Sequence, residues 1–173
     1  MLTDKILKKQ FLNQLINFLW TILCFAPVIF FWLLAGPGTW FYGFLVASFF
    51  SGFLSSRFFQ LSNIPQYYEK PGVKWIRKFV QNGDLVNRLF KKDNTIDTTI
   101  KNKNYAEKYL KTVSMYEKYH VICFVFFCLS GIFAIFKHKF VYFILIMAGN
   151  ILYNLCPVIL QQYNRARILR LIK

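Results

Sequence analysis

Two long apolar stretches, separated by a polar segment, dominate the chain. The first runs from 11 to 56, where 46 consecutive residues include no Asp, Glu, Lys or Arg. The second runs from 121 to 160 and is interrupted only by Lys137-His138-Lys139. The hydrocarbon core of a bilayer is about 30 Å thick and requires roughly 20 apolar residues per helix. Each stretch is therefore long enough to cross a membrane twice.

Two short breaks divide these stretches into four segments. Gly36-Pro37-Gly38 contains residues that end helices and form tight turns, and the second break is Lys137-His138-Lys139. An apolar fraction of 56% and an aromatic fraction of 20% also exceed those of soluble domains. We therefore predict an all-α integral membrane protein, a single domain over 1–173, with four transmembrane helices and amphipathic interfacial helices in a large cytoplasmic loop. The predicted spans are 11–34, 40–56, 120–136 and 140–161, and the predicted cytoplasmic segment is 57–119.

The distribution of positive charge predicts the orientation in the membrane. With these spans, 20 of the 22 Lys and Arg residues lie on the side that carries both termini and the segment 57–119. Cytoplasmic loops are enriched in Lys and Arg, so this side is predicted to be cytoplasmic, in the inner (cytoplasmic) membrane of the cell. Topology accounts for most of the net charge of +15, and we expect no nucleic-acid partner. The same surface would attract membrane lipids or anionic ligands such as phosphates. The sequence does not indicate which oligomeric state the protein adopts.

The polar segment between the apolar stretches contains candidate helices. The residues at 75–80 have the pattern of a short amphipathic helix that lies in the membrane interface, and 85–90 is a second candidate. The stretch 105–120 is predicted to be helical and to continue into the third span. The alternative is a solvated linker that follows the membrane surface.

The fourth span carries polar residues at membrane depth, where each is costly unless it has a partner. Asn150, Asn154, Pro157 and Gln161 are spaced by 4, 3 and 4 residues, which places them on one helical face. This stripe is expected to face the other helices or a cavity. It either binds a substrate or supplies hydrogen bonds between helices, as polar residues in membrane bundles commonly do.

A candidate catalytic pair lies at the start of the third span. Glu117 and His120 are separated by three residues, so their side chains share a helix face and can form a hydrogen bond. A carboxylate that orients an imidazole is a general-base arrangement. The alternative is an interfacial salt bridge. No metal site is expected, because a di-iron centre would need a second copy of this motif. Cys24, Cys123, Cys128 and Cys156 are interpreted as small apolar side chains.

A second polar group, Tyr163-Asn164-Arg165-Ala166-Arg167, follows the fourth span. Its arginines either anchor the helix at the interface or pair with a phosphate or carboxylate, which suits the guanidinium group. The third span leaves the cytoplasmic side and the fourth returns to it, so this group and the Glu117–His120 pair are expected at the same membrane level.

Three motifs carry a resemblance to a known family. The pattern Asn154-x-x-Pro157-x-x-x-Gln161-x-Tyr163-Asn164-Arg165-x-Arg167 resembles the C-terminal signature of the glycosyl-4,4'-diaponeurosporenoate acyltransferases. Glu117-x-x-His120 resembles an acidic–histidine pair of that family, and Glu69-Lys70-x-Gly72-x-x-Trp75 resembles the start of its cytoplasmic segment. The resemblance covers roughly residues 60–170.

The resemblance implies transfer of a fatty acyl group to a sugar hydroxyl of a glycosylated carotenoid or similar glycolipid at the membrane. The donor would be acyl-CoA or a similar activated acyl group, acting as a substrate, with no bound cofactor. His120 would be the base, oriented by Glu117, and Arg165 and Arg167 would hold the donor's phosphates. Asn154, Asn164 or Tyr163 would donate hydrogen bonds to the oxyanion. Further substrate-binding candidates from the motifs are Glu69, Trp75 and Gln161.

Two alternative functions compete with this interpretation. One is a non-enzymatic subunit or assembly factor of a membrane complex, with the aromatic spans as packing surfaces. The other is a different enzyme that modifies a polyprenyl lipid or a phospholipid.

Overall fold

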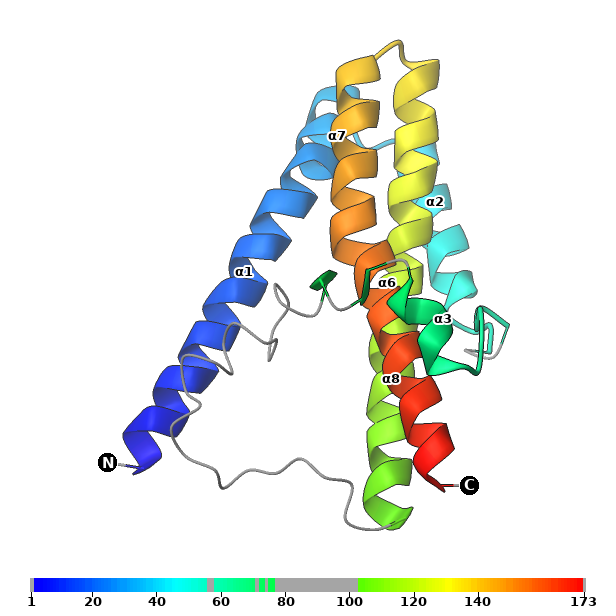
Figure 1. The fold of residues 1–173 in the computed structure, drawn as a ribbon. Helices are drawn as coiled ribbons and strands as arrows, with labels where there is room; N and C mark the ends of the chain where they lie inside the picture. The colour runs from blue at the N-terminus through cyan, green and yellow to red at the C-terminus, as the bar shows by residue number, and fades with distance from the viewer. Residues whose placement is uncertain (1, 56–57, 71, 74, 77–102, 173) are drawn as a thin grey trace.

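The structure is a computed structural model that describes residues 2–55, 58–70, 72–73, 75–76 and 103–172, and its regular elements are all helices (Figure 1). They are α1 (Leu2–Ala35), α2 (Thr39–Ser51), α3 (Pro65–Glu69), α6 (Lys103–Phe136), α7 (Phe140–Asn150), the π-helical segment η1 (Ile151–Leu155) and α8 (Cys156–Ile172). The prediction of an all-α protein is confirmed for this part of the chain. Most of 75–80 and all of 85–90 lie outside the described residues.

Three helical stretches are long and apolar enough to cross a membrane, so the chain is a membrane protein. They are Leu7–Ala35, Ala106–Phe136 and Phe140–Arg170. The remaining apolar helix, α2, has 13 residues and ends at Ser51 rather than at 56. A helix of this length spans about 20 Å, less than the hydrocarbon core. A crossing by α2 stays a prediction.

A close approach between helices coincides with the end of α2. A Cβ atom at Gly52 would lie 2.6 Å from the Cδ1 atom of Ile122 in α6, so a larger residue does not fit without movement of that side chain. The amide of Gly52 donates to the carbonyls of Phe49 and Phe50, and the chain then continues in turns. The helix thus ends at its close approach to α6, before the end of the apolar stretch that encodes it.

Both chain termini lie at one end of the bundle, which we call the basic end, and the two short turns lie at the other, the turn end (Figure 1). α6 is continuous from Lys103 to Phe136. It confirms the prediction that the helix of 105–120 continues into the third span. Which side of the membrane the basic end faces stays a prediction from charge.

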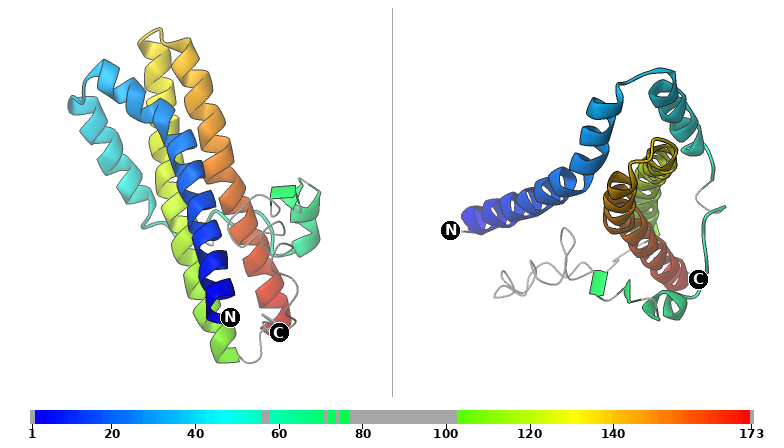
Figure 2. Two further views of the ribbon diagram at one scale, coloured as in Figure 1. Left: turned by 90° about the vertical axis from the view of Figure 1, so that its left-hand side faces the viewer. Right: turned by 90° about the horizontal axis from the view of Figure 1, so that it is seen from above.

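An aromatic core holds the turn end together. Trp32 of α1 is stacked on Phe133 of α6, with ring centroids 5.3 Å apart, and its indole N–H donates to the hydroxyl of Ser130 over 3.0 Å. Phe31, Phe127 and Ile146 are buried in the same cluster. The N-terminal half of α1 diverges from α6 and α8 toward the basic end (Figures 1 and 2). Its packing is therefore concentrated near the turn end.

The crossing of α1 and α7 depends on a glycine. A Cβ atom added at Gly149 would lie 2.9 Å from the carbonyl oxygen of Cys24 and 3.4 Å from its Cα atom. Both contacts are with backbone, which cannot move aside as the end of a side chain can. Small residues permit such close approaches between membrane helices.

We expect Gly149→Ala to destabilise the detergent-solubilised protein by about 1–3 kcal/mol, as overpacking of a tight contact does. Gly43→Ala in α2 is the matched control, because a Cβ atom there meets nothing within 4 Å. Thermal unfolding followed by circular dichroism measures both. Equal melting temperatures for the two variants would contradict the tight crossing.

Candidate functional site

The polar residues near the basic end form two separate clusters. We call the first the ion-pair network; it consists of Gln60, Tyr68, Glu117, Gln162 and Arg165. The second, the histidine cluster, consists of Thr21, His120, Asn150, Tyr153 and Asn154. The first joins α6 and α8 to residues 59–68, and the second joins α6 to α1, α7 and η1.

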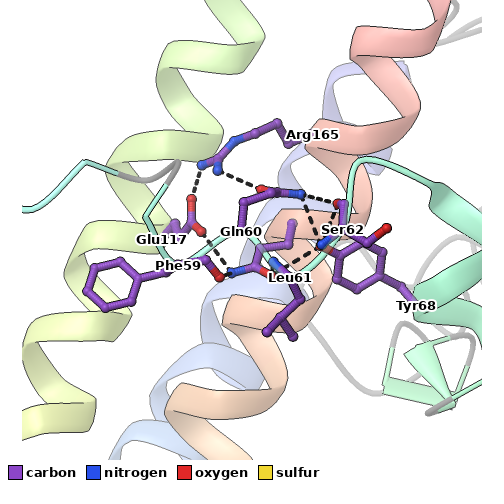
Figure 3. Close-up of polar contacts among 8 residues, drawn as sticks. Phe59, Gln60, Leu61, Ser62, Tyr68, Glu117 and Arg165 are labelled. Carbon is purple, nitrogen blue, oxygen red and sulfur yellow. Dashed lines mark hydrogen bonds and ion pairs between the residues drawn. The ribbon is translucent and has the colours of Figure 1, made fainter.

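A buried salt bridge between Glu117 and Arg165 is the centre of the ion-pair network (Figure 3). The Glu117 side chain is 1% exposed and that of Arg165 is 9% exposed. The second carboxylate oxygen accepts a hydrogen bond of 3.2 Å from the amide of Gln162. Arg165 also donates to the side-chain oxygen of Gln60 over 2.8 Å. Both charges are thus paired and hydrogen-bonded, which is the condition for burying them.

The network also holds a stretch of backbone that follows α2. The amide of Gln162 donates to the carbonyl of Phe59 over 2.8 Å, and its oxygen accepts from the backbone of Leu61. The Tyr68 hydroxyl accepts from the backbone N–H of Ser62 over 2.9 Å. It can donate to the Ser62 carbonyl, 2.8 Å away (Figure 3). Burial raises the pKa of the Tyr68 phenol, so the hydroxyl keeps the hydrogen that it donates.

A chain of amide hydrogen bonds orders the histidine cluster. Asn150 donates through Nδ2 to the carbonyl of Phe124, 3.2 Å away. A carbonyl only accepts, so the oxygen of Asn150 must face the other way, where it accepts from Nδ2 of Asn154 over 2.9 Å. The orientation of the Asn154 amide follows: its nitrogen is used, and its oxygen is left as an acceptor.

Two buried polar atoms remain without a hydrogen bond among the described residues, namely Nδ1 of His120 and Oδ1 of Asn154. The two side chains lie within interaction range of one another, and the backbone of Tyr153 also approaches the imidazole. The Tyr153 ring contacts the His120 ring edge to face, with centroids 5.6 Å apart. An imidazole nitrogen can donate or accept, whereas the amide oxygen only accepts, so the two atoms are complementary.

The π-helical segment and Pro157 explain the geometry of this cluster. Pro157 has no amide hydrogen, so the carbonyl of Tyr153 lacks the donor that an α-helix would supply four residues later. The helix widens at Ile151–Leu155, where the amide of Cys156 reaches back to the carbonyl of Ile151. π segments of this kind are frequent at functional sites. Asn154, within it, is 0% exposed.

The structure separates the predicted catalytic pair. Among the described residues, both oxygens of Glu117 are hydrogen-bonded to Gln162 and Arg165, and no hydrogen bond joins Glu117 to His120. The imidazole is approached instead by Asn154 and by the rings of Tyr119 and Tyr153. The predicted meeting of α6 with the 163–167 group is present, but it is made by Glu117 and Arg165.

One comparison with known proteins gives a match. Residues 51–173 match the model of the glycosyl-4,4'-diaponeurosporenoate acyltransferase family. The chain belongs to this family. No curated protein and no solved structure matches it. The matched part contains the whole ion-pair network and all of the histidine cluster except Thr21, whereas α1 and nearly all of α2 precede it.

Another contact between the family motifs joins α8 to α3. The Tyr163 hydroxyl donates to the carboxylate of Glu69 over 3.3 Å. The C-terminal signature therefore contacts the motif that begins at Glu69, the last residue of α3. Arg167 is exposed, with its guanidinium carbon 5.5 Å from the centre of the Tyr163 ring. Asn164 is half-buried, and Trp75 is 66% exposed. Two of the three family motifs are therefore in contact through Tyr163 and Glu69.

The predicted stripe of the fourth span changes register at the π segment. Asn150 and Asn154 are fully buried, as an inward-facing stripe requires. Beyond the π segment, however, the buried glutamine is Gln162, which is 1% exposed, and Gln161 is only half-buried. One extra residue in the wider turn accounts for the difference. The roles of Gln162, Gln60 and Tyr68 were not predicted. For Gln162 the sequence held one indication, because Pro157 shortly after the buried Asn154 disturbs the regular helical spacing.

We expect Glu117→Leu and Arg165→Met each to destabilise the protein by about 3–5 kcal/mol, because each leaves a buried charge without its ion-pair partner. The double variant should lose clearly less than the sum of the two single losses. Equilibrium unfolding of the detergent-solubilised protein measures all three. Arg167→Met, at an exposed arginine of the same helix, is the control and should change stability by about 0.5 kcal/mol or less. Additive losses would show that the pair is not coupled.

Proposed function

We propose that the protein transfers a fatty acyl group from acyl-CoA, or a similar activated donor, to a sugar hydroxyl of a glycosylated carotenoid or similar glycolipid. Family membership supports acyl transfer to such acceptors. The observation that carries the proposal for this chain is the half-buried His120, whose unpartnered Nδ1 atom lies in a cluster with the unpartnered oxygen of Asn154.

The proposed chemistry uses His120 as a general base that Asn154 orients. An N–H at Nδ1 directed at Oδ1 of Asn154 leaves Nε2 with its lone pair. Nε2 takes the proton of the sugar hydroxyl as the oxygen attacks the acyl carbonyl carbon. The tetrahedral intermediate collapses, the C–S bond to the donor breaks, and the thiolate leaves with the proton that His120 returns. A new ester and a free thiol result, and the imidazole is neutral again.

The roles of the remaining motif residues follow from their positions. Glu117 and Arg165 hold α6, α8 and residues 59–62 together beside the base, and so position it. Arg167 and Lys118 are both exposed, and their positive charges suit the donor's phosphates. One N–H of the Asn154 amide donates to Asn150, and the second N–H of the same group is the proposed donor to the oxyanion.

The proposed location of the reaction is the cytoplasmic face of the inner membrane. Acyl-CoA is a cytosolic thioester, and 20 of the 22 Lys and Arg residues belong to the segments that are predicted to be cytoplasmic. An amphiphilic acceptor would keep its hydrocarbon part in the bilayer and present its sugar at the interface. His120 lies at the middle of α6, where the charged stretch 103–119 meets the apolar stretch 121–136, and such a sugar would be found at this kind of boundary.

We expect His120→Asn to lower acyl transfer by a factor of about 100 or more, the contribution typical of a positioned general base. The chain has two histidines, and His138→Asn is the matched control. His138 is exposed in the turn between α6 and α7 at φ 53°, a conformation that Asn tolerates. Mass spectrometry of lipids from cells that make the glycosylated acceptor measures the acylated product. Full activity of an inserted His120→Asn variant would refute the role, and a change in other lipids alone would indicate a different lipid-modifying enzyme.

We expect Asn154→Ala to lower kcat by about 10- to 100-fold with a smaller change in KM, because loss of an orienting partner affects the base more than substrate binding. Asn13→Ala removes a buried amide of α1, outside the residues that match the family, and should leave both constants nearly unchanged. Kinetics in membranes with matched amounts of inserted protein separate the two parameters. Equal effects of the two substitutions would argue for a general packing role.

A further inference from the structure

We propose that an apolar groove between α1, α2 and α6 holds the acyl chain of the donor during transfer, an inference that rests on the proposed function. The groove has a volume of about 510 Å³ and is lined by side chains that include Phe25 of α1, Leu45 and Ser48 of α2, and Cys123, Phe126 and Phe127 of α6. Ligand pockets typically have volumes of about 300–1,000 Å³.

The chemistry of the groove selects for hydrocarbon. Its walls are almost entirely aromatic and aliphatic. The hydroxyl of Ser48 donates to the carbonyl of Phe44 over 2.6 Å, so its hydrogen is not available to a ligand. A polar group placed here would lose its hydrogen bonds with water and gain few in return, whereas a methylene group gains burial.

The groove lies next to the histidine cluster. Cys123 follows His120 by three residues, just under one turn of α6, and forms part of the groove wall. The opposite wall includes Phe25, whose ring contacts both Phe127 and Tyr153 edge to face, at 5.0 Å and 5.1 Å. Tyr153 in turn contacts the ring of His120. An acyl chain in the groove would therefore have its carbonyl end near the proposed base.

The extent of the groove favours a flexible chain over a rigid polyene. On α6 the lining residues run from Ile122 to Phe127, a rise of about 8 Å. Leu45 and Val46, on the rim, are 42% and 57% exposed, so the groove opens sideways toward lipid. A saturated chain can bend within this space and enter from the bilayer. A stiff conjugated acceptor would extend beyond it and is better accommodated in the lipid itself.

Leu45→Trp is the variant that tests the groove. Gly52 of α2 lies against Ile122, and α2 runs antiparallel to α6, so Leu45 lies two turns further from His120. A larger ring here should block long chains and spare short ones. We expect the activity ratio of palmitoyl-CoA to octanoyl-CoA to fall at least about tenfold, roughly the effect of losing the burial of two methylene groups.

The control and a second variant make the test specific. Leu33→Trp makes the same change on α1 at a site that is 69% exposed and not in the groove, so its ratio should equal that of the unmodified protein. Phe126→Ala widens the far part of the groove and should shift preference toward longer chains. If the ratio is the same in all four proteins, the groove does not hold the acyl chain and is filled by bilayer lipid.

A second measurement needs no turnover. A photoreactive palmitoyl-CoA, with its diazirine near the chain end, is irradiated with the membranes, and the labelled residues are identified by mass spectrometry. Label concentrated on the groove residues of α2 and α6 supports the proposal. This measurement still decides the question if the Leu45→Trp variant turns out to be inactive with every donor. Label spread over the lipid-facing side of all helices overturns it. An unmodified protein inactive with every chain length, yet labelled in the groove, would refute acyl transfer but retain the acyl-binding site.

Discussion

The buried ion pair between Glu117 and Arg165 is the contact on which the basic end of the bundle depends. Neither charge can be buried alone at an acceptable free energy, so α6 and α8 must meet with these two residues at the same level. The pair also needs further hydrogen-bond partners, which are supplied by Gln162 from α8 and Gln60 from the stretch after α2. One electrostatic requirement therefore determines the positions of three segments that are distant in the sequence.

This arrangement leaves His120 in a neutral environment. The carboxylate that could have paired with it is bonded elsewhere, and the neighbouring groups are amides, a phenol and a hydroxyl. Hydrogen bonds fix the direction of a neutral amide as firmly as a charge would, and the order Phe124, Asn150, Asn154 leaves only one orientation for each side chain. The charged network thus holds the chain in place, and the uncharged cluster presents the imidazole.

The sequence predicted the three long apolar helices, because the apolar runs and the breaks between them are local features of composition. The absence of charge over 46 residues and the Gly-Pro-Gly turn are visible without any long-range contact. The early end of α2 was not predictable, since it coincides with the approach of Gly52 to Ile122, 70 positions later. The bond between Gln60 and Arg165 joins residues 105 positions apart, and no periodicity encodes it.

The candidate site shows the same division between local and long-range information. Helical spacing correctly placed Asn150 and Asn154 on a buried face, because they are only four positions apart along the chain. It placed Glu117 and His120 on one face as well, but it could not show that Arg165 and Gln162 would bind both carboxylate oxygens. A regular α-helix through Ile151–Leu155 would place Gln161 on the buried face. The structure has a π-helical segment there, which places Gln162 on that face instead.

The π-helical segment also has a consequence for how the gene can vary. Removal of one residue within Ile151–Leu155 would restore a regular α-helix and would appear conservative in a hydropathy plot. It would leave Gln162 and Arg165 facing Glu117, because the π segment holds the one residue that a regular helix of this length does not need. The same deletion between Pro157 and Gln162 would instead rotate both side chains away from Glu117 by about 100°, the turn per residue of an α-helix. The π segment is thus a position at which the gene can change by one codon without loss of the ion pair.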